Sequence, residues 1–367
     1  MFKRLGLRYI WVLLLLPVTI LLQWLCSNYP QFTENIYSRG IFPLLSGIIA
    51  PVFGLLTFSM AELIVVLLAV LLIVYIIRGI LHFRRIRFRG IIRGALKLAA
   101  IAATALFLFN IMWGLNYYRE PLYKNLGYVN GDVNKADLAA VTGEEVAAIN
   151  KLSPLLLYDK AGVTYYEGGF TAMRKEVNVG YTLLRSDKIV GTLIDNVKSS
   201  PKGVIPSQLM SYTGIEGIFI PFTYEPSINT DCPDFVLPFN ISHETAHLKG
   251  FAREDEANFI AYLASCQNPD KYYQYSGHMS ALMYLSNALY ATDQNLWKQE
   301  FAQLDKRAAA DFNNYNDFLT KHQGKVSDAA EKINDNYLKS QGQTQGVISY
   351  DMFVNLLVSR FATQRAR

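Results

Sequence analysis

Apolar residues are distributed unevenly along the chain, and their pattern predicts two parts. Three long apolar stretches lie in the first third, at residues 9–26, 58–77 and 98–115. Each is close to the ~20 residues that an α-helix needs to cross the hydrocarbon core of a bilayer. After residue 118 the hydropathy falls to values typical of a globular protein. We therefore expect a membrane anchor of three transmembrane helices at 1–118 and a soluble domain at 119–367.

The first apolar stretch also resembles a signal peptide, because the basic residues Lys3, Arg4 and Arg8 precede it. No small-x-small cleavage site follows, since residues 26–30 read Cys-Ser-Asn-Tyr-Pro. We interpret the stretch as an uncleaved transmembrane helix. A shorter apolar segment at 41–53, interrupted by proline and glycine, predicts a short interfacial helix.

The soluble part has mainly helical periodicity. Helices are predicted at 136–152, 238–250, 254–265, 277–290, 293–319 and 327–339. Two segments rich in β-branched and aromatic residues, 177–184 and 215–224, are predicted as strands. Prolines in and after the second segment place it at a sheet edge or end it. The expected fold class is α+β and mainly helical with a small sheet, and the polar segment 341–346 is expected to be a loop.

Charge supports this division and predicts an orientation. Residues 1–118 hold eleven Lys/Arg and two acidic residues, a net charge of +9. Seven of the basic residues lie around the connection between the second and third expected spans, and short loops of this kind stay in the cytoplasm. With the basic N-terminus also inside, three spans place residues 119–367 outside. Aromatic residues stand where an outer interfacial belt is expected, at Trp24, Tyr29, Trp113, Tyr117 and Tyr118.

The soluble part is slightly acidic, with 24 basic and 28 acidic residues. A nucleic-acid-binding domain needs a basic face, so we do not expect nucleic acid as a partner. The three cysteines, Cys26, Cys232 and Cys266, show no CxxC spacing, which argues against a thiolate metal site. Cys232 and Cys266 could form a disulfide in an oxidising compartment or remain free thiols.

The sequence His243-Glu244-Thr245-Ala246-His247 carries the most chemistry. Two histidines four residues apart on a helix project from one face toward a single ion. Glu244 lies about 100° around that helix, so it can approach a metal-bound water without being a ligand. Zinc lowers the pKa of such a water toward ~7, and a neighbouring glutamate accepts and returns its proton. The pattern predicts a Zn²⁺ site with His243 and His247 as ligands and Glu244 as general base.

A third ligand is expected in the acidic stretch that follows. Gly250 can end the first helix in a left-handed conformation, and a second helix can then return acids to the metal. Glu254 and Asn258 share one face of that second helix. This favours Glu254 as the ligand and Asn258 as a residue that orients a ligand from behind. Glu256, about 200° away from Glu254 on the helix, is the alternative ligand.

Zinc hydrolases often stabilise the developing oxyanion with a Tyr or His side chain. The candidates for this role are His278, Tyr262, Tyr275 and Tyr337. The chain contains 23 tyrosines, so most are expected to serve packing, and the sequence does not select among the four.

The string HETAH followed by EDEAN resembles the gluzincin arrangement of the membrane-bound Ste24/HtpX-type and the ImmA/IrrE-type peptidases. In those families the first Glu of the acidic string binds zinc, which implies Glu254 as ligand and Asn258 in the place of a supporting Asp. The spacing from His247 to Glu254 is shorter than in Ste24-type enzymes. A metzincin's third His would fall on Arg253, which excludes that class. With three N-terminal spans, the longer string is similar to an uncharacterised bacterial membrane protein family (domain of unknown function 3810) over nearly the whole chain.

Together these features predict a zincin-like domain held by three spans on the outer side of a bacterial cytoplasmic membrane, with the lipid bilayer as a partner. The leading hypothesis is a zinc metallopeptidase that hydrolyses a peptide or protein substrate. The alternatives are a non-catalytic or regulatory zinc-binding membrane protein and a zincin-like hydrolase of cell-wall or lipid material. Glu244 favours a hydrolase, because a zinc scaffold needs no general base.

Overall fold

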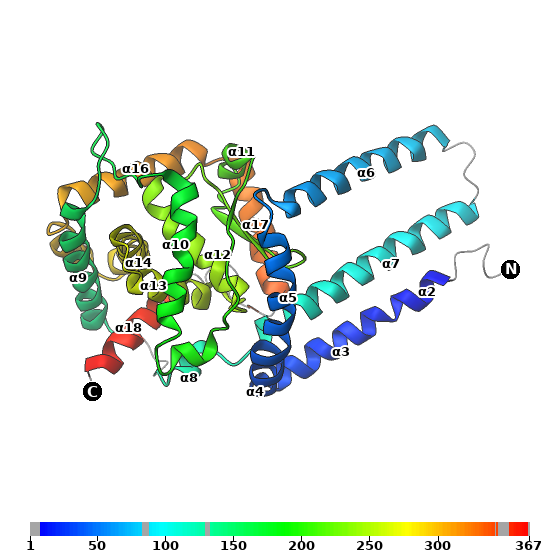
Figure 1. The fold of residues 1–367 in the computed structure, drawn as a ribbon, viewed down its shortest axis with the longest axis horizontal. Coiled ribbons are helices and arrows are strands. Elements are labelled where there is room, and N and C mark those ends of the chain that lie inside the picture. The colour runs from blue at the N-terminus through cyan, green and yellow to red at the C-terminus, as the bar shows by residue number, and fades with distance from the viewer. Residues whose placement is uncertain (1–7, 83–87, 129–132, 342, 344–351, 366–367) are drawn as a thin grey trace.

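The computed structural model describes residues 8–82, 88–128, 133–341, 343 and 352–365. Within these residues the chain is mainly helical and contains one three-stranded sheet. Figure 1 shows a helical body from which long helical rods project in one direction. The mainly helical fold with a small sheet is confirmed.

Apolar helices make up the N-terminal third. They are α2 (Arg8–Leu13), α3 (Leu15–Asn28), α4 (Pro30–Phe32), the π-helical η1 (Thr33–Ile41), α5 (Phe42–Gly54), α6 (Met60–His82) and α7 (Phe88–Met112). Among the described residues four segments are long and apolar enough to cross a membrane, namely Tyr9–Asn28, Pro30–Gly54, Met60–Gly79 and Gly90–Met112. The α2–α3 rod, α6 and α7 extend away from the body, whereas α5 runs across their direction beside the body (Figure 1).

All three expected spans correspond to helices in the structure, with changed bounds and one addition; α6 ends at His82 rather than residue 77. Helix α7 begins at Phe88 rather than residue 98, because Arg and Lys in its first turns lower the hydropathy without interrupting a helix. It ends at Met112 rather than residue 115. The segment expected as a short interfacial helix, 41–53, forms α5 and continues a helical unit that begins at Pro30.

The body is built around α12 (Leu237–Leu248), the helix that carries both motif histidines. It packs against α10 (Gly169–Leu184), α13 (Glu254–Gln267) and α14 (Lys271–Thr292), while α9 (Lys135–Leu152) packs on α14. The remaining elements of the body are η3 (Gly114–Tyr118), α8 (Leu122–Asn125), η4 (Ser153–Leu155), η5 (Val190–Leu193), α11 (Ser207–Ser211), η6 (Asp234–Val236), α15 (Gln294–Phe301), α16 (Lys306–His322), α17 (Lys325–Ser340) and α18 (Met352–Arg365).

The sheet has the strand order β1-β3-β2, which leaves β2 at one edge. Strand β1 (Lys202–Gly203) pairs in parallel with β3 (Glu225–Ile228), and β2 (Gly217–Ile220) pairs with β3 in the antiparallel direction. The expected strand at 215–224 is therefore present over its middle residues. It ends before Pro221, in agreement with the expected effect of proline.

The prediction of a strand at 177–184 is wrong, because this segment is the second half of α10. Its apolar residues alternate, but Val177, Tyr181 and Leu184 also repeat at helical spacing, and all three are buried. Gly180 lies between them, and a Cβ there would approach the carbonyl oxygen of Ala264 to 2.3 Å. The missing side chain thus lets α10 pack closely on α13.

The predicted helix at 293–319 is two helices, α15 and α16. Asp293 accepts hydrogen bonds from the first amides of α15, and Asp305 accepts one from Arg307 at the start of α16. Both acids are helix N-caps, and the second one starts a new helix in the middle of an otherwise helical pattern. The other predicted helices of the body are confirmed within a few residues, apart from α14, which begins earlier than expected. Most of the loop expected at 341–346 lies outside the described residues.

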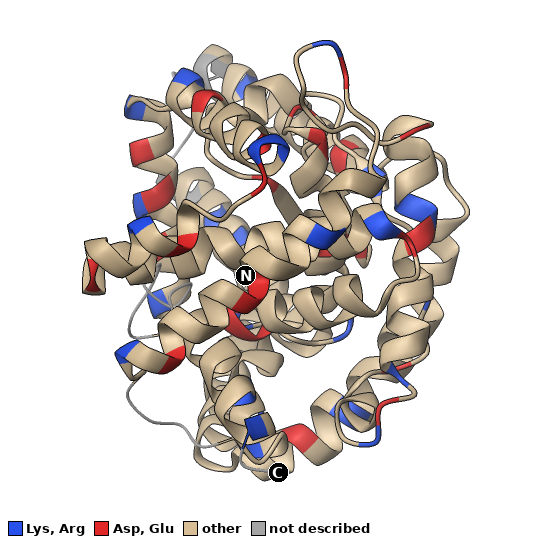
Figure 2. Ribbon diagram, turned by 90° about the vertical axis from the view of Figure 1, so that its left-hand side faces the viewer, with Lys and Arg blue, Asp and Glu red and all other residues tan. Residues whose placement is uncertain are grey.

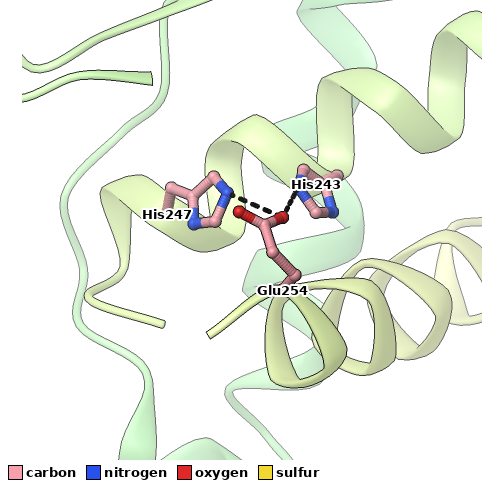
Figure 3. Close-up of side chains that lie close together, drawn as sticks. All are labelled: His243, His247 and Glu254. Atoms are coloured by element: carbon pink, nitrogen blue, oxygen red, sulfur yellow. Dashed lines mark ion pairs between the residues drawn. The ribbon is translucent and has the colours of Figure 1, made fainter. Parts of the chain in front are cut away.

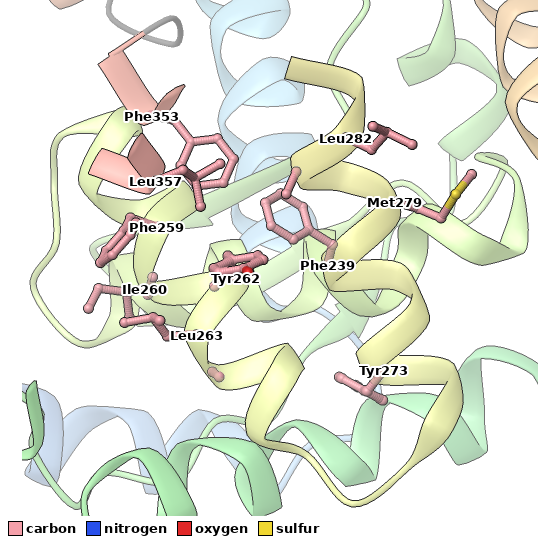
Figure 4. Packing of buried hydrophobic residues seen from close by; sticks show 14 of the residues in the cluster. Phe239, Phe259, Ile260, Tyr262, Leu263, Tyr273, Met279, Leu282, Phe353 and Leu357 are labelled. Carbon is pink, nitrogen blue, oxygen red and sulfur yellow. The ribbon is translucent and has the colours of Figure 1, made fainter. Parts of the chain in front are cut away.

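The main core of the body lies between α12, α13, α14 and α18. Figure 4 shows aromatic and aliphatic side chains from these four helices that belong to one buried cluster, including Phe239, Tyr262, Met279 and Phe353. These side chains are almost fully buried, so α12 is held on this side by close packing.

A second apolar cluster joins the N-terminal helices to the body. Trp113, Leu115 and Tyr117, at the end of the membrane segment, lie in it with Phe219 of β2 and Leu248 of α12. Trp113 and Tyr117 are only 5% and 4% exposed, so their expected place in an outer aromatic belt is wrong. Both side chains pack inside the protein.

Charged residues of both signs are interspersed over the body. Figure 2 views the molecule from the end opposite the projecting rods and shows Lys and Arg next to Asp and Glu along the same helices. No extended basic face is visible in this view.

Candidate metal centre

Helix α12 presents His243 and His247 from one face. The two residues are one helical turn apart, and their ring centroids are separated by 4.7 Å. Almost the whole helix is buried, including Thr245 and Ala246 between the histidines. A helix this enclosed fixes the directions in which both imidazoles point.

The turn after α12 depends on Gly250, which has a φ of +83°. Its amide donates to the carbonyl of His247 (2.9 Å) and the Phe251 amide donates to the carbonyl of Ala246 (3.1 Å), as in a left-handed C-terminal cap. A Cβ at Gly250 would also lie 3.1 Å from the ring of Phe42 in α5. The chain reverses within three residues, and α13 begins at Glu254.

Glu254 points back between the two histidines (Figure 3). Its Oε2 atom lies 3.1 Å from Nε2 of His243 and 3.7 Å from Nε2 of His247. Each of these three residues offers one possible ligand atom, and no two of the three atoms are more than 4.8 Å apart. Two imidazole nitrogens and one carboxylate oxygen are the donor set of a catalytic zinc site that keeps a fourth position open.

The other ring nitrogens of both histidines already have partners. Nδ1 of His243 lies 2.7 Å from Oδ1 of Asn258, and Nδ1 of His247 lies 2.7 Å from the carbonyl oxygen of Phe251. Each partner is an acceptor, so each Nδ1 carries a proton, and each Nε2 would present a lone pair to a bound cation once its own proton is displaced. Metal-binding histidines are oriented in this way.

The charged groups of the cluster strongly shift one another's pKa values. Burial by itself raises the pKa of Glu254, but the two histidines outweigh it and hold the pKa well below its usual range. Burial lowers the pKa of His247, but the Glu254 carboxylate reverses this and raises it to about 9. A cation held by the three side chains would replace the imidazolium proton as the counter-charge of Glu254.

Glu244 is buried between α12 and the edge strand β2. It is 4% exposed, and its Oε2 atom has no hydrogen-bond partner among the described residues. A Cβ at Gly217 of β2 would lie 2.5 Å from the Glu244 Oε1 atom, so only glycine leaves room for this carboxylate. Burial raises the pKa of Glu244, while His247 and His243 lower it.

A family model described as "Protein of unknown function (DUF3810)" matches residues 37–358 of the chain. The chain belongs to the DUF3810 family. It matches no curated protein and no solved structure. The matched region begins within η1 and includes the apolar helices after it as well as the whole histidine–glutamate cluster.

In this DUF3810 chain the alternative ligand Glu256 is turned away from the histidines. Its Oε1 atom accepts from the amide of Leu122 (2.8 Å) and from Nη1 of Arg253 (2.7 Å). The structure therefore brings Glu254 into the cluster and uses Glu256 to connect α13 to the start of the body. Asn258 lies one turn after Glu254 and reaches His243 as described above.

Of the four oxyanion candidates, only Tyr337 is close to the cluster. Burial raises its pKa, and the Glu254 carboxylate adds to the shift. Its hydroxyl lies 3.2 Å from the Tyr117 hydroxyl. Tyr262 and His278 both bond to Glu145, at 2.6 Å each, and Tyr275 donates to Asp311 (2.7 Å). These three residues satisfy buried carboxylates elsewhere in the body.

The sequence alone did not identify two residues as part of the candidate metal centre. Trp113 donates from Nε1 to the carbonyl oxygen of His247 (3.2 Å), and its ring meets the His247 ring edge-to-face at 5.7 Å. Gly217 makes room for Glu244. An unusual glycine at the start of an apolar strand was visible in the sequence, but nothing in it connected Trp113 to a histidine 134 residues away.

Cys232 and Cys266 are free thiols in the structure, which favours the second of the two possibilities left by the sequence.

Proposed function

We propose that this protein is a membrane-anchored zinc hydrolase that cleaves peptide bonds. The observation that carries the proposal is the convergence of His243 Nε2, His247 Nε2 and Glu254 Oε2, with both Nδ1 atoms occupied by acceptors. The buried, unpartnered Oε2 atom of Glu244 lies on the same helix. A non-catalytic zinc scaffold has no need of such a carboxylate.

Zinc held at this site would polarise a bound water and a substrate carbonyl. Glu244 would accept the proton of the water at its unpartnered Oε2 atom and deliver it to the leaving amine. Its burial favours this role, because desolvation raises the pKa of the carboxyl and makes it a better base. Tyr337 would donate its hydroxyl hydrogen to the oxyanion.

The edge strand β2 supports a peptide as the substrate. Among the described residues no strand pairs with β2 on the side away from β3. Gly217, in this strand, packs against the general base. An extended peptide that adds to a sheet edge gains backbone hydrogen bonds regardless of its sequence. Such a peptide would run past Glu244, whereas a lipid or glycan gains nothing from a strand edge.

The charge distribution supports a body on the outer side of a bacterial cytoplasmic membrane. The end of α6 and the start of α7 lie remote from the body (Figure 1), and the sequence between residues 78 and 97 holds seven basic residues. A connection this basic stays in the cytoplasm. With α2–α3, α6 and α7 as the spans and α5 along the interface, the metal centre lies outside.

The test uses the full-length chain in detergent, because residues of the membrane segment belong to the same apolar cluster as β2 and α12. Bound zinc is measured by mass spectrometry, and cleavage is measured on a mixed peptide library. Glu244→Gln should keep zinc and lose about 10²- to 10⁴-fold in rate, as expected for a general base. Glu254→Ala should lose both the bound zinc and peptide cleavage.

Glu167→Gln, at an exposed position, serves as the control for removing a carboxylate and should behave as wild type. A wild-type protein without stoichiometric zinc would contradict the proposal. Zinc binding with no cleavage of any peptide, equally in wild type and Glu244→Gln, would support the non-catalytic alternative instead.

A further inference from the structure

We propose that Glu34, Arg119 and Trp113 are positioning residues of the metal centre, so that metal binding requires the docked membrane segment. The inference rests on the proposed zinc site. It assigns a role in that site to Trp113 and Arg119, more than 120 residues before the ligands, and to Glu34, inside an apolar helical unit.

Arg119 makes the central connection. Its guanidinium forms a two-pronged ion pair with Glu34 of η1, with Nε–Oε2 and Nη2–Oε1 distances of 2.7 Å each. Its third nitrogen, Nη1, donates to the carbonyl oxygen of Gly250 at 2.9 Å. The guanidinium carbon also lies 4.4 Å from the centre of the Phe251 ring. Arg119 is 1% exposed, so these contacts are protected from water.

The turn that Arg119 holds is the one that orients His247. The carbonyl oxygen of Phe251 accepts from Nδ1 of His247 at 2.7 Å. Arg119 donates to the carbonyl of Gly250, the residue before Phe251, and it also packs against the ring of Phe251. The direction of the Phe251 carbonyl is therefore set by a residue bonded to the membrane segment. That carbonyl in turn decides where Nε2 of His247 points.

Trp113 contacts the same ligand independently. It follows the last residue of α7, and its Nε1 atom donates to the backbone carbonyl of His247 at 3.2 Å. Its ring lies edge-to-face against the imidazole, with centroids 5.7 Å apart. His247 is thus held by a hydrogen bond from Trp113, directly after α7, and through Arg119 by an ion pair to η1.

The ion pair between Glu34 and Arg119 is weak evidence for a contribution to stability. Removing two charges from water is costly, and apolar side chains of the same volume would often hold the segments together equally well. A planar guanidinium with a bidentate carboxylate and a fixed carbonyl does offer a defined geometry. This favours a role in orientation over a role in holding the fold together.

The experiment compares three variants of the full-length protein in detergent. Arg119→Lys keeps the charge but loses the fork, Glu34→Gln loses the charge of its partner, and Trp113→Phe keeps an aromatic ring but loses the donor to His247. Arg307→Lys is the matched control, because Arg307 forms an ion pair with Asp305 in a half-exposed position away from the centre. For each protein we would measure the Zn²⁺ dissociation constant by chelator competition and the visible spectrum of the Co²⁺-substituted form. Thermal unfolding of the metal-free protein is the third measurement.

Arg119→Lys and Glu34→Gln should weaken zinc binding by about 10- to 100-fold, as is usual for residues that orient a ligand. All three variants should shift the cobalt absorption bands, while Arg307→Lys leaves both measurements unchanged. A merely structural role would instead lower the unfolding temperature of the metal-free protein with affinity and spectrum unchanged, and this result would overturn the inference. If Arg119→Lys does not fold, Trp113→Phe decides through its cobalt spectrum. Failure of the wild type to bind zinc refutes the proposed function itself, whereas zinc binding that is identical in all variants refutes only this inference.

Discussion

The Oδ1 atom of Asn258 lies 2.7 Å from Nδ1 of His243 and holds this histidine with its Nε2 atom directed at Glu254. An amide oxygen accepts this hydrogen bond without a charge. A carboxylate in the same place would make the imidazole a stronger base and a better metal ligand. The side-chain nitrogen of Asn258 is used too, since it lies 3.4 Å from the Tyr284 hydroxyl.

The substitution Asn258→Asp should therefore keep zinc binding or strengthen it, whereas Asn258→Leu should weaken it by about 10- to 100-fold. Chelator competition on the purified full-length protein measures both effects. Equal affinities for Asn258→Leu and wild type would show that the hydrogen bond does not orient the histidine.

Gly217→Ala should separate zinc binding from catalysis. The added Cβ would lie 2.5 Å from the Glu244 Oε1 atom and 2.7 Å from its Cγ atom, so the carboxylate must move. We expect normal zinc content and a rate reduced toward that of Glu244→Gln. Gly79→Ala is the control, because a Cβ there has no neighbour within 4 Å in the described part of the chain. A Gly217→Ala protein with full activity would place the general base elsewhere.

Tyr337→Phe should reduce the rate of peptide cleavage by about 10²- to 10³-fold, the usual cost of losing one oxyanion donor. Zinc content should not change, because the hydroxyl is not among the converging ligand atoms. Tyr275→Phe provides the comparison. It should leave the rate intact and cost about 1–3 kcal/mol of stability, since the buried Asp311 loses a donor. Steady-state kinetics and thermal unfolding of both variants distinguish the two roles, and equal rates for the two variants would exclude Tyr337.

The pair between His278 and Glu145 should make stability depend on pH. Burial lowers the pKa of His278, but Cys266 and the Glu145 carboxylate at 2.6 Å outweigh it and raise the pKa to about 11. A raised histidine pKa adds stability that is fully present below the unfolded value of ~6.5 and is lost as the pH rises through the folded value. The stability difference between wild type and His278→Gln should thus be largest below pH ~6.5 and decrease steadily above it.

Unfolding temperatures of both proteins, recorded in the same detergent at several pH values, test this expectation. The measurement should be made on metal-free samples, so that proton competition at the zinc site does not contribute. A difference that grows with pH would show that the pair is not a charged one in the folded protein.

The parts of the centre that could be predicted are those set by local geometry. His243 and His247 lie on the same face of any helix. Gly250 ends that helix because glycine readily adopts the left-handed conformation that a helix C-terminal cap requires. The return of Glu254 depends on a turn of only three residues. Each of these relationships spans at most a few residues of sequence, so periodicity and capping rules are sufficient to find them.

Relationships between distant segments were beyond reach. Arg119 and Trp113 meet the turn and the helix of the motif across more than 130 residues. Their aromatic and basic character at the end of an apolar helix is equally typical of residues at a membrane interface. The prediction of a strand at 177–184 is wrong for a related reason. Its pattern fits both a strand and the buried face of a helix, and only the close approach to α13 at Gly180 decides between them.

The contact of Gly250 with Phe42 has a consequence for the order of assembly. Synthesis proceeds from the N-terminus, so Phe42, Glu34 and Arg119 leave the ribosome well before the histidine motif. The residues that receive the turn at Gly250 are therefore synthesised first, within the membrane-associated part. A nascent chain whose apolar helices had not yet inserted would expose histidines that are not yet aligned, and under the proposed function it would bind zinc only after reaching the bilayer.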